Sequence, residues 1–251
     1  MRAGGVYDYN YFTGKKYESK RAGRCVSFSM QFSGENRGSD SDTEEMYTVG
    51  IGKLYENQRK LAGQAFMDIQ EFDMEKTGTA ALLTYDGLVF KHTEAVLWKK
   101  DDLEYAQNHL RILSACYGSL KPLDAIHPYR LEMQCKIPID GQNLYAFWGE
   151  DIYRDVYRDN SIVLNLASEE YAKCVRKYAK YDRFIDVEFL NMHKGKLKTL
   201  ATLAKMARGH MVQYIMKKRI DTPEEIKAFD WNGYKYESSL SDERKIVFIS
   251  G

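Results

Sequence analysis

Apolar residues recur at helical spacing along several parts of the chain. Leu103 and Leu110 fall on one face of a helix that we expect over residues 101–114. Asp101 is placed to cap this helix, with Glu104 three residues later as its reciprocal partner. The same spacing predicts further helices over four segments, 54–71, 144–158, 168–178 and 203–219.

Strand-like patterns lie between these helices. The segments 79–85 and 88–92 predict two strands joined at Asp86-Gly87, a dipeptide that favours a tight turn. Further strands are expected over 130–138, 161–167 and 244–250, and as a second hairpin over 184–190 and 196–201 with its turn at 193–195. Because strands, hairpins and helices are interleaved, the pattern predicts an α/β fold: a single compact domain with a mixed sheet flanked by helices.

Residues 1–50 differ from the rest of the 251-residue chain. They are rich in Gly, Ser and Tyr, they lack a periodic apolar pattern, and they include the polar stretch QFSGENRGSDSDTEE. Such composition favours turns and mobility over a packed core. We therefore expect a divergent, partly flexible N-terminal segment over 1–50 and the α/β domain over 51–251.

The composition favours a packed, soluble protein, since hydrophobic residues make up 44% of the chain and charged residues 29%. No apolar run is long enough to span a bilayer and the N-terminus has no apolar leader. We therefore expect no membrane partner and a cytoplasmic location. No Cys-x-x-Cys pair is present, and reduced thiols are expected at the four cysteines, Cys25, Cys116, Cys135 and Cys174.

Charge is unevenly spread along the chain although the net charge is only +1. The window 189–220 holds eight Lys or Arg residues and no Asp or Glu. A basic stretch in a near-neutral protein favours a one-sided positive surface that attracts phosphates. The alternative is a solvated helix face together with a basic strand.

The stretch 113–133, LSACYGSLKPLDAIHPYRLEM, places polar side chains in a loop shaped by one glycine and two prolines. Lys121 is either a phosphate ligand or a solvent-facing lysine. Arg130 and Glu132 are expected to share one face of a strand. They form either a phosphate ligand with its orienting partner or a surface ion pair of little energetic weight.

A second place that favours anions is the end of the strand expected over 161–166. Asn165 would lie at its carboxyl end, and Ser168 would begin the next helix, whose free N–H groups suit an anion. The alternative is simple capping by Ser168.

The helix expected over 203–219 carries Lys205 and Arg208 three residues apart, on one side. Gly209 in its interior is unfavourable by about 1 kcal/mol relative to Ala, which indicates a close neighbour. We favour tight helix packing there over contact with a ligand.

No metal site or cofactor fingerprint emerges. The five histidines lack the usual ligand spacings, and no Gly-x-Ser-x-Gly, Walker or dinucleotide motif is present. We therefore expect no cofactor and no metal, and assign no catalytic residue.

Several separated segments together resemble the YaaA peroxide-stress family, and their order makes the resemblance stronger than any single motif. The segments are LTYDGLVF (83–90), HLRILSACYGSLKPLD (109–124), HPYRLEM (127–133), LYAFWGE (144–150), NLASEEY (165–171), LAKMARG (203–209) and FDWNGYKY (229–236). The resemblance implies an α/β fold with a helix-hairpin-helix element and a positively charged cleft. It also implies a bacterial cytoplasmic protein that binds DNA and limits oxidative DNA damage.

The chain departs from the family pattern in three places. Nothing in residues 1–50 matches the Ser-Pro-Ala-Lys turn near the family's first strand. Ala115 stands where the family usually has Gly, and Lys121 where it often has Arg. Lysine keeps the charge but lacks the planar fork of arginine. The segment from the helix 101–114 through the turn at 117–119 is the candidate for the helix-hairpin-helix element.

The leading hypothesis is a protein that binds duplex DNA, largely without sequence specificity, or a nucleotide. The alternative is an enzyme acting on a nucleotide or nucleobase in the same cleft, and a weaker one is a scaffold of the stress response. The oligomeric state stays open. Candidate phosphate ligands are Lys121, Arg130, Lys205 and Arg208, and candidate polar groups of the cleft are Asp124, Tyr129, Glu132, Asn165 and Ser168.

Overall fold

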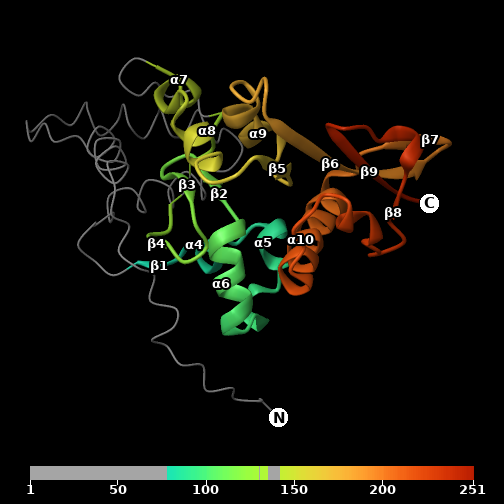
Figure 1. The fold of residues 1–251 in the computed structure, drawn as a ribbon, viewed down its shortest axis with the longest axis horizontal. Coiled ribbons are helices and arrows are strands. Elements are labelled where there is room, and N and C mark those ends of the chain that lie inside the picture. Colours follow the sequence, from blue (N-terminus) through green and yellow to red (C-terminus); the bar gives the residue numbers. More distant parts are fainter. Residues whose placement is uncertain (1–77, 130, 135–141) are drawn as a thin grey trace, which may run out of the picture. The chain divides into compact units, whose positions relative to one another are not determined.

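A computed structural model describes residues 78–129, 131–134 and 142–251, which belong to two compact units (Figure 1). The first unit contains the described residues of 78–84 and 112–149, and the second contains 85–111 and 150–251. The expected helix over 54–71 and the expected boundary after residue 50 lie outside the described residues, so the domain division stays a prediction.

The first unit is built from short strand pairs and short helices. Its elements are β1 (Thr79–Ala80), α4 (Ala81–Thr84), β2 (Ile112–Ser114), β3 (Gly118–Leu120), β4 (Ala125–Ile126) and α7 (Leu144–Trp148). β1 pairs with β4 and β2 pairs with β3, both antiparallel. Trp148 is buried against this framework, and its indole N–H donates to the Ala115 carbonyl at 2.8 Å. Gly118 has φ +80°, and a Cβ there would lie 2.8 Å from the Trp148 ring.

The second unit holds a mixed sheet with strand order β5-β6-β9-β8, with β7 paired to β6. Its strands are β5 (Ile162–Asn165), β6 (Arg183–His193), β7 (Lys196–Lys198), β8 (Lys235–Tyr236) and β9 (Lys245–Ser250). β5 and β9 run parallel to β6, whereas β7 runs antiparallel to β6 and β8 antiparallel to β9. The predicted α/β fold with a mixed sheet is therefore confirmed.

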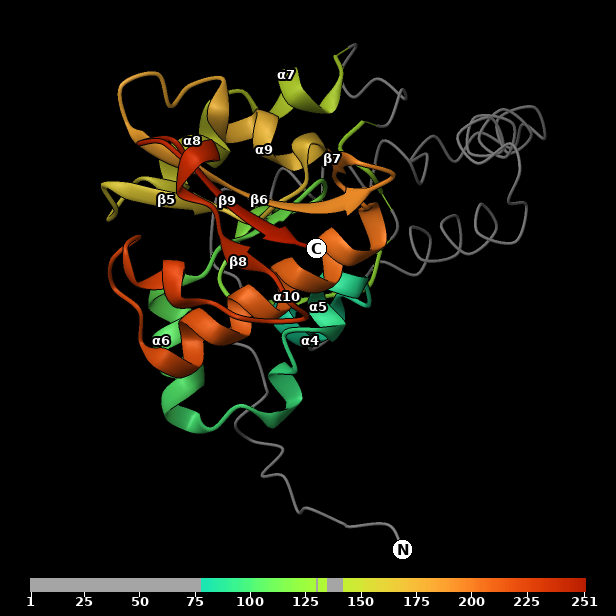
Figure 2. The same cartoon turned by 90° about the vertical axis from the view of Figure 1, so that its right-hand side faces the viewer.

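Helices cover this sheet on both sides, with α9 and α10 on opposite faces (Figure 2). The helices of the unit are α5 (Leu88–Lys91), η2 (Ala95–Leu97), α6 (Lys100–His109), α8 (Asp151–Val156), α9 (Glu169–Arg176), α10 (Ala201–Lys218), η3 (Glu225–Ala228) and η4 (Ser238–Leu240). Aromatic rings fill the core beside β6. Phe189 stacks on Phe248 at 5.5 Å, and the edge of Tyr234 meets Phe189 at 5.3 Å. Such ring pairs add specific geometry to apolar burial.

Several of the predicted elements are present. The hairpin around residues 193–195, the strand before Ser168, the helix after it, the long helix α10 and the last strand are confirmed. The helix expected over 144–158 is found as α7 and α8, separated at Gly149, whose φ of +48° breaks the helix. Thr222 precedes η3, and its amide and hydroxyl donate to the Glu225 carboxylate at 3.0 and 2.8 Å.

The strand pair predicted over 79–92 is wrong. After the two residues of β1, the chain turns into α4, and α5 follows where the pattern predicts the second strand. Gly87 has φ −73° and precedes α5, so it does not adopt the positive φ of a hairpin turn. The Ala81-Leu82-Leu83 run has high helix propensity, and the Ala81 amide is fixed by the Asp124 carbonyl at 2.8 Å.

The helix expected over 101–114 is shorter than predicted. It ends at His109, and Leu113 lies in β2. Asp102, rather than Asp101, accepts the Lys99 amide at the helix start, at 2.9 Å. The following turn joins β2 to β3, so the described residues from 100 to 126 contain no helix-hairpin-helix element. The segment 131–134 forms a turn rather than the expected strand, and Arg130 and residues 135–138 lie outside the described residues.

Asp102 ties α6 to the end of α10. Its carboxylate accepts hydrogen bonds from Lys217 at 2.5 Å and from Arg219 at 2.8 Å, with only 9% of the side chain exposed. Burial by itself would raise the pKa of Asp102, but the bonds from Lys217, the Lys99 amide and Arg219 outweigh it and lower the pKa to about 2. The ionised carboxylate is therefore held more strongly in the folded protein than in the unfolded chain.

Gly209 marks the closest approach of α10 to α5, which lie side by side (Figure 1). A Cβ at this position would lie 2.3 Å from the carbonyl oxygen of Val89 and 2.7 Å from Cβ of His92. His92 and His210 meet at the same crossing, with Nδ1 and Nε2 3.1 Å apart. The expectation that tight helix packing explains this glycine is confirmed.

We predict that Asp102→Asn lowers the free energy of unfolding at pH 7 by about 2 kcal/mol, in line with a pKa displaced by roughly two units. Because the folded-state pKa lies below the unfolded value, this stability is present above about pH 4 and is lost as the pH falls towards 2. Urea denaturation of the variant and the wild type across this range measures it. The exposed neighbour Asp101→Asn is the control; equal effects of the two substitutions at pH 7 would contradict the assignment.

We predict that Gly209→Ala destabilises the protein by about 2 kcal/mol or more, although alanine favours a helix by about 1 kcal/mol over glycine. The new methyl would meet backbone atoms of α5, which have no free rotamer to move away. Gly87→Ala is the matched control, because a Cβ there meets only Phe90, at an ordinary 3.8 Å. Thermal unfolding compares the two, and a stabilised Gly209→Ala variant would refute the close packing.

Candidate nucleic-acid interface

The β6–β7 hairpin carries the most accessible part of the basic window. β9 pairs with β6 only as far as Asn191, so the hairpin continues beyond that partner strand. Lys194 and Gly195 form its turn with φ of +49° and +73°, which matches the twist of a two-residue hairpin loop. Lys196 and Lys198 follow on β7, and all three lysines are exposed. In the described part of the chain, none of these three lysines has an ion-pair partner.

Two apolar side chains lie on the same hairpin and were missed by sequence reasoning. Met192 and Leu197 are cross-strand partners, with exposed fractions of 53% and 36%. For Leu197 a signal was available, because it lies between Lys196 and Lys198 next to the predicted turn; nothing comparable marks Met192. At the next register position, His193 is the cross-strand partner of Lys196, and these two side chains lie on the other face of the hairpin.

α10 continues the basic surface after the hairpin. Lys205 is exposed, and no ion pair involves it among the described residues. Arg208, one turn further on, is half-buried, and its Nε has no hydrogen-bond partner within the described ranges. Burial lowers the pKa of Arg208, and the negative charge of Asp186 partly opposes that effect.

A polar cluster forms around Asp186, where β5 ends against β6. Asn165 donates to the Asp186 carboxylate at 2.6 Å, and Arg176 of α9 donates to the same oxygen at 2.7 Å. Arg176 also bridges to Glu169 at 2.5 Å. Burial is the largest single influence on the Arg176 guanidinium and lowers its pKa. The hydrogen bonds and charges of Glu169 and Asp186 together outweigh burial, so the pKa is raised. Asp186 thus gathers Asn165 and Arg176 and lies within electrostatic reach of Arg208.

Sequence reasoning found Asn165 and Arg208 but missed Asp186 and Arg176. A charged residue within the apolar run FIDVEFL was the available signal for Asp186. Nothing local points to Arg176, which lies in the last turn of α9 and reaches Asp186 only through the tertiary fold.

At the end of β5, the Asn165 side chain expected to bind an anion makes hydrogen bonds within the protein. Asn165 accepts the Ala167 amide at 3.0 Å, and Ser168 begins α9 without a side-chain capping bond. Glu169 and Glu170 occupy the first turn of α9, where their charges already complement the helix dipole. A role of Asn165 and Ser168 in anion binding stays a prediction.

The other cations of the window are differently placed. Lys217 and Arg219 both pair with the single carboxylate of Asp102, and Lys218 is exposed. The exposed lysines of the window therefore form two groups, one on the hairpin and at Lys205 and the other at the end of α10.

The loop residues predicted from the sequence lie in the first unit. Lys121 is exposed, and the Asp124 carboxylate accepts its backbone amide at 2.8 Å, which fixes the turn. The Tyr129 hydroxyl lies 2.6 Å from Ser114 Oγ. Glu132 is exposed, and Arg130 lies outside the described residues. Asp124 and Tyr129 therefore contribute to the local structure, and the convergence of these residues with Lys205 and Arg208 stays a prediction.

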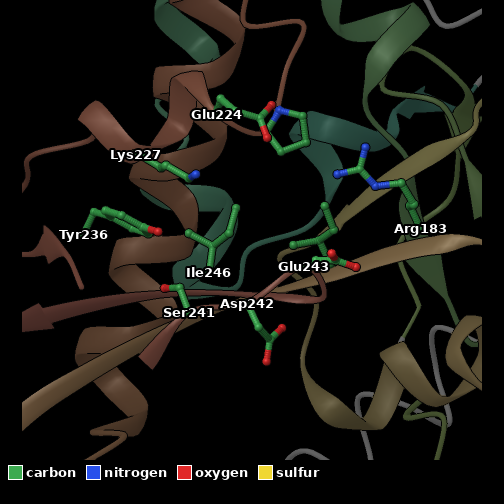
Figure 3. A pocket seen from close by; sticks show the side chains of 10 residues that line it. Arg183, Glu224, Lys227, Tyr236, Ser241, Asp242, Glu243 and Ile246 are labelled. Atoms are coloured by element: carbon green, nitrogen blue, oxygen red, sulfur yellow. The ribbon is translucent and has the colours of Figure 1, made fainter. Parts of the chain in front are cut away.

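A hollow of about 360 Å³ lies at the start of β6 in the second unit (Figure 3). Figure 3 shows Arg183 and Lys227 around it together with the carboxylates of Glu224, Asp242 and Glu243. Three acids against two cations give this hollow a net negative lining, which repels a polyanion. The hollow is therefore a poor place for nucleic acid.

The two described cysteines differ in state. Cys174 is a free, buried thiol, and burial raises its pKa to about 12. Cys116 is disulfide-bonded, which departs from the expectation of reduced thiols throughout. Among the described residues, no three His, Cys, Asp or Glu side chains gather as a metal would require. None of the described helices is both long and apolar enough to cross a membrane.

Known proteins similar to this chain include one family profile and several bacterial relatives that share one name. The profile of a family described as "Peroxide stress protein YaaA" matches residues 15–240. A "UPF0246 protein" of Agathobacter rectalis is 44% identical over 191 residues, covering 75% of this chain and 77% of the relative. "UPF0246 protein" relatives of Limosilactobacillus reuteri and Ligilactobacillus salivarius are 42% and 41% identical, over 75% and 79% of this chain and 77% and 81% of their own length.

We predict that Asp186→Asn destabilises the protein by about 1–2 kcal/mol, because Arg176 and Arg208 lose the carboxylate they share. High salt should recover part of this loss by screening the two cations from each other. Urea denaturation at low and high salt measures both effects. Glu188→Gln is the control, two residues along the same face of β6; indistinguishable results for the two variants would exclude a special role for Asp186.

Proposed function

The chain belongs to the YaaA family of peroxide stress proteins, and from this membership we propose that it binds duplex DNA through the β6–β7 hairpin and the start of α10. In that way it would limit oxidative damage to DNA. The observation that carries the proposal is the set of exposed hairpin lysines without acidic partners in the described part of the chain.

The hairpin suits phosphate contact for a physical reason. Lysines that pair with protein carboxylates gain little from DNA, because one ion pair replaces another. Lys194, Lys196 and Lys198 have no such pair within the described ranges, so DNA phosphates add an attraction and release counterions. The hairpin turn and the adjoining strand hold these charges on a stiff element, which reduces the entropy lost on binding.

Binding of this kind carries little base recognition. Lysine is a flexible point charge, whereas readout of a base edge favours the planar groups of Arg, Asn or Gln. Phosphate contacts position a protein on the duplex without reading sequence. We therefore propose largely non-sequence-specific binding.

Direct reduction of peroxide by the described cysteines is disfavoured. The thiolate is the reactive form, and the Cys174 thiol with its pKa of about 12 stays protonated at neutral pH. The enzymatic alternative, action on a nucleotide or nucleobase, gains no specific support, because Asp124, Tyr129 and Asn165 are engaged in local hydrogen bonds.

We predict that the protein binds duplex DNA with an affinity that falls steeply with salt, with a log–log slope of about −0.9 per phosphate neutralised. Replacing Lys194, Lys196 and Lys198 together by Gln should make this slope shallower by about 0.9 for each phosphate that the variant no longer neutralises. Fluorescence anisotropy of a labelled duplex at several salt concentrations measures the slopes of both proteins.

The control removes the same charge from another part of the second unit, by replacing Lys173, Lys177 and Lys180 with Gln. This control should lower the affinity slightly and leave the slope close to that of the wild type. If the wild type shows no salt-dependent binding, or if both triple variants lose binding equally, the hairpin is not the DNA-binding element.

A further inference from the structure

The two faces of the β6–β7 hairpin differ in chemistry. Met192 and Leu197 are directly opposite each other on the two strands, so their side chains share one face. Lys196 and His193 pair at the next position, and their side chains point to the other face because neighbours along a strand alternate. An exposed apolar pair thus lies directly behind a basic turn.

This pair lies where the sheet has ended. The register of β9 stops at Asn191, and only β7 accompanies β6 beyond it in the described chain. The element that carries Met192 and Leu197 is therefore two strands wide, or about 5 Å between strand axes. A ribbon of that width enters a groove of duplex DNA.

The exposed pair is available to a partner, and covering it would bury apolar surface. Apolar side chains such as Met and Leu can be inserted between base pairs by proteins that bend DNA, partly unstacking one step. The positive charge of the hairpin indicates which kind of partner would cover the apolar pair. Lys194 lies at the turn, and Lys196 and Lys198 project from the opposite face of the same narrow ribbon. A partner that surrounds the ribbon therefore meets positive charge on one side and apolar surface on the other, which fits stacked bases between phosphate strands.

We propose that Met192 and Leu197 act as a wedge that inserts between base pairs, so that this protein prefers duplexes with an easily unstacked step over uniformly stacked ones. The inference rests on the proposed DNA binding and adds the class of DNA that is preferred. The lysines supply attraction to any duplex, and the wedge supplies discrimination, because a mismatched or flexible step opens at lower energetic cost.

The test compares two duplexes of equal length and charge, one fully paired and one with a central mismatch, each with 2-aminopurine beside the central step. Fluorescence of 2-aminopurine reports unstacking, and anisotropy gives the affinity. For the wild type we expect binding to the mismatched duplex to be about tenfold tighter, because a mismatched step is easier to unstack, together with a rise in 2-aminopurine fluorescence.

The variant Met192→Ala/Leu197→Ala should bind the paired duplex with nearly the wild-type salt slope, and should lose both the preference and the fluorescence rise. Its side chains are exposed, so the fold is expected to persist. The control Val96→Ala/Leu97→Ala removes two apolar side chains that are 60% and 61% exposed in η2 of the same unit, and should behave as the wild type.

The outcomes separate this inference from the function on which it rests. Salt-dependent binding with no mismatch preference, or with a preference that survives Met192→Ala/Leu197→Ala, overturns the wedge and leaves DNA binding in place. Absence of any DNA binding by the wild type overturns both. Binding to vesicles of anionic lipid that depends on Met192 and Leu197, without distortion of DNA, also overturns the wedge and assigns the pair to a membrane surface.

Discussion

The length of β6 is the constraint on which the described second unit depends. This eleven-residue strand pairs first with β5, then with β9 and finally with β7, so each neighbour covers only part of it. The inner positions of the strand hold the aromatic core, including Phe189. The last residues of β6 extend beyond both β5 and β9, and there they pair only with β7 through the hairpin. The same strand therefore anchors the fold at one end and presents the basic hairpin at the other.

The distribution of acids decides which cations are available for a ligand. Asp102 pairs with both Lys217 and Arg219 where α6 meets α10, and Asp186 pairs with Arg176 beside β5. These pairs are partly buried, so their loss would leave uncompensated charge inside the protein. Within the described chain, the hairpin lysines form no ion pair with a protein carboxylate. A net charge of +1 thus conceals a division between cations that stabilise the fold and cations that face solvent.

Much of the second unit could be predicted from periodicity, because its elements are long and regular. The 18-residue helix α10 and the β6–β7 hairpin follow directly from their patterns. The short elements around 79–92 could not, since four-residue helices such as α4 and α5 carry too few positions to show a period. The Asp186 cluster joins residues up to 21 positions apart, and no local pattern reports such an interaction. The packing at Gly209 could be predicted, because glycine is unfavourable inside a helix and its presence there indicates a close neighbour.

The most direct test of the account is to locate the DNA-binding surface on the protein. Backbone amide NMR of the full chain, titrated with a short duplex, maps it residue by residue. The account predicts shift changes concentrated at 192–198 and near Lys205 that fade as salt is raised. Changes confined to the acidic hollow around Glu224 and Asp242, or a hairpin that does not respond to DNA, would contradict it.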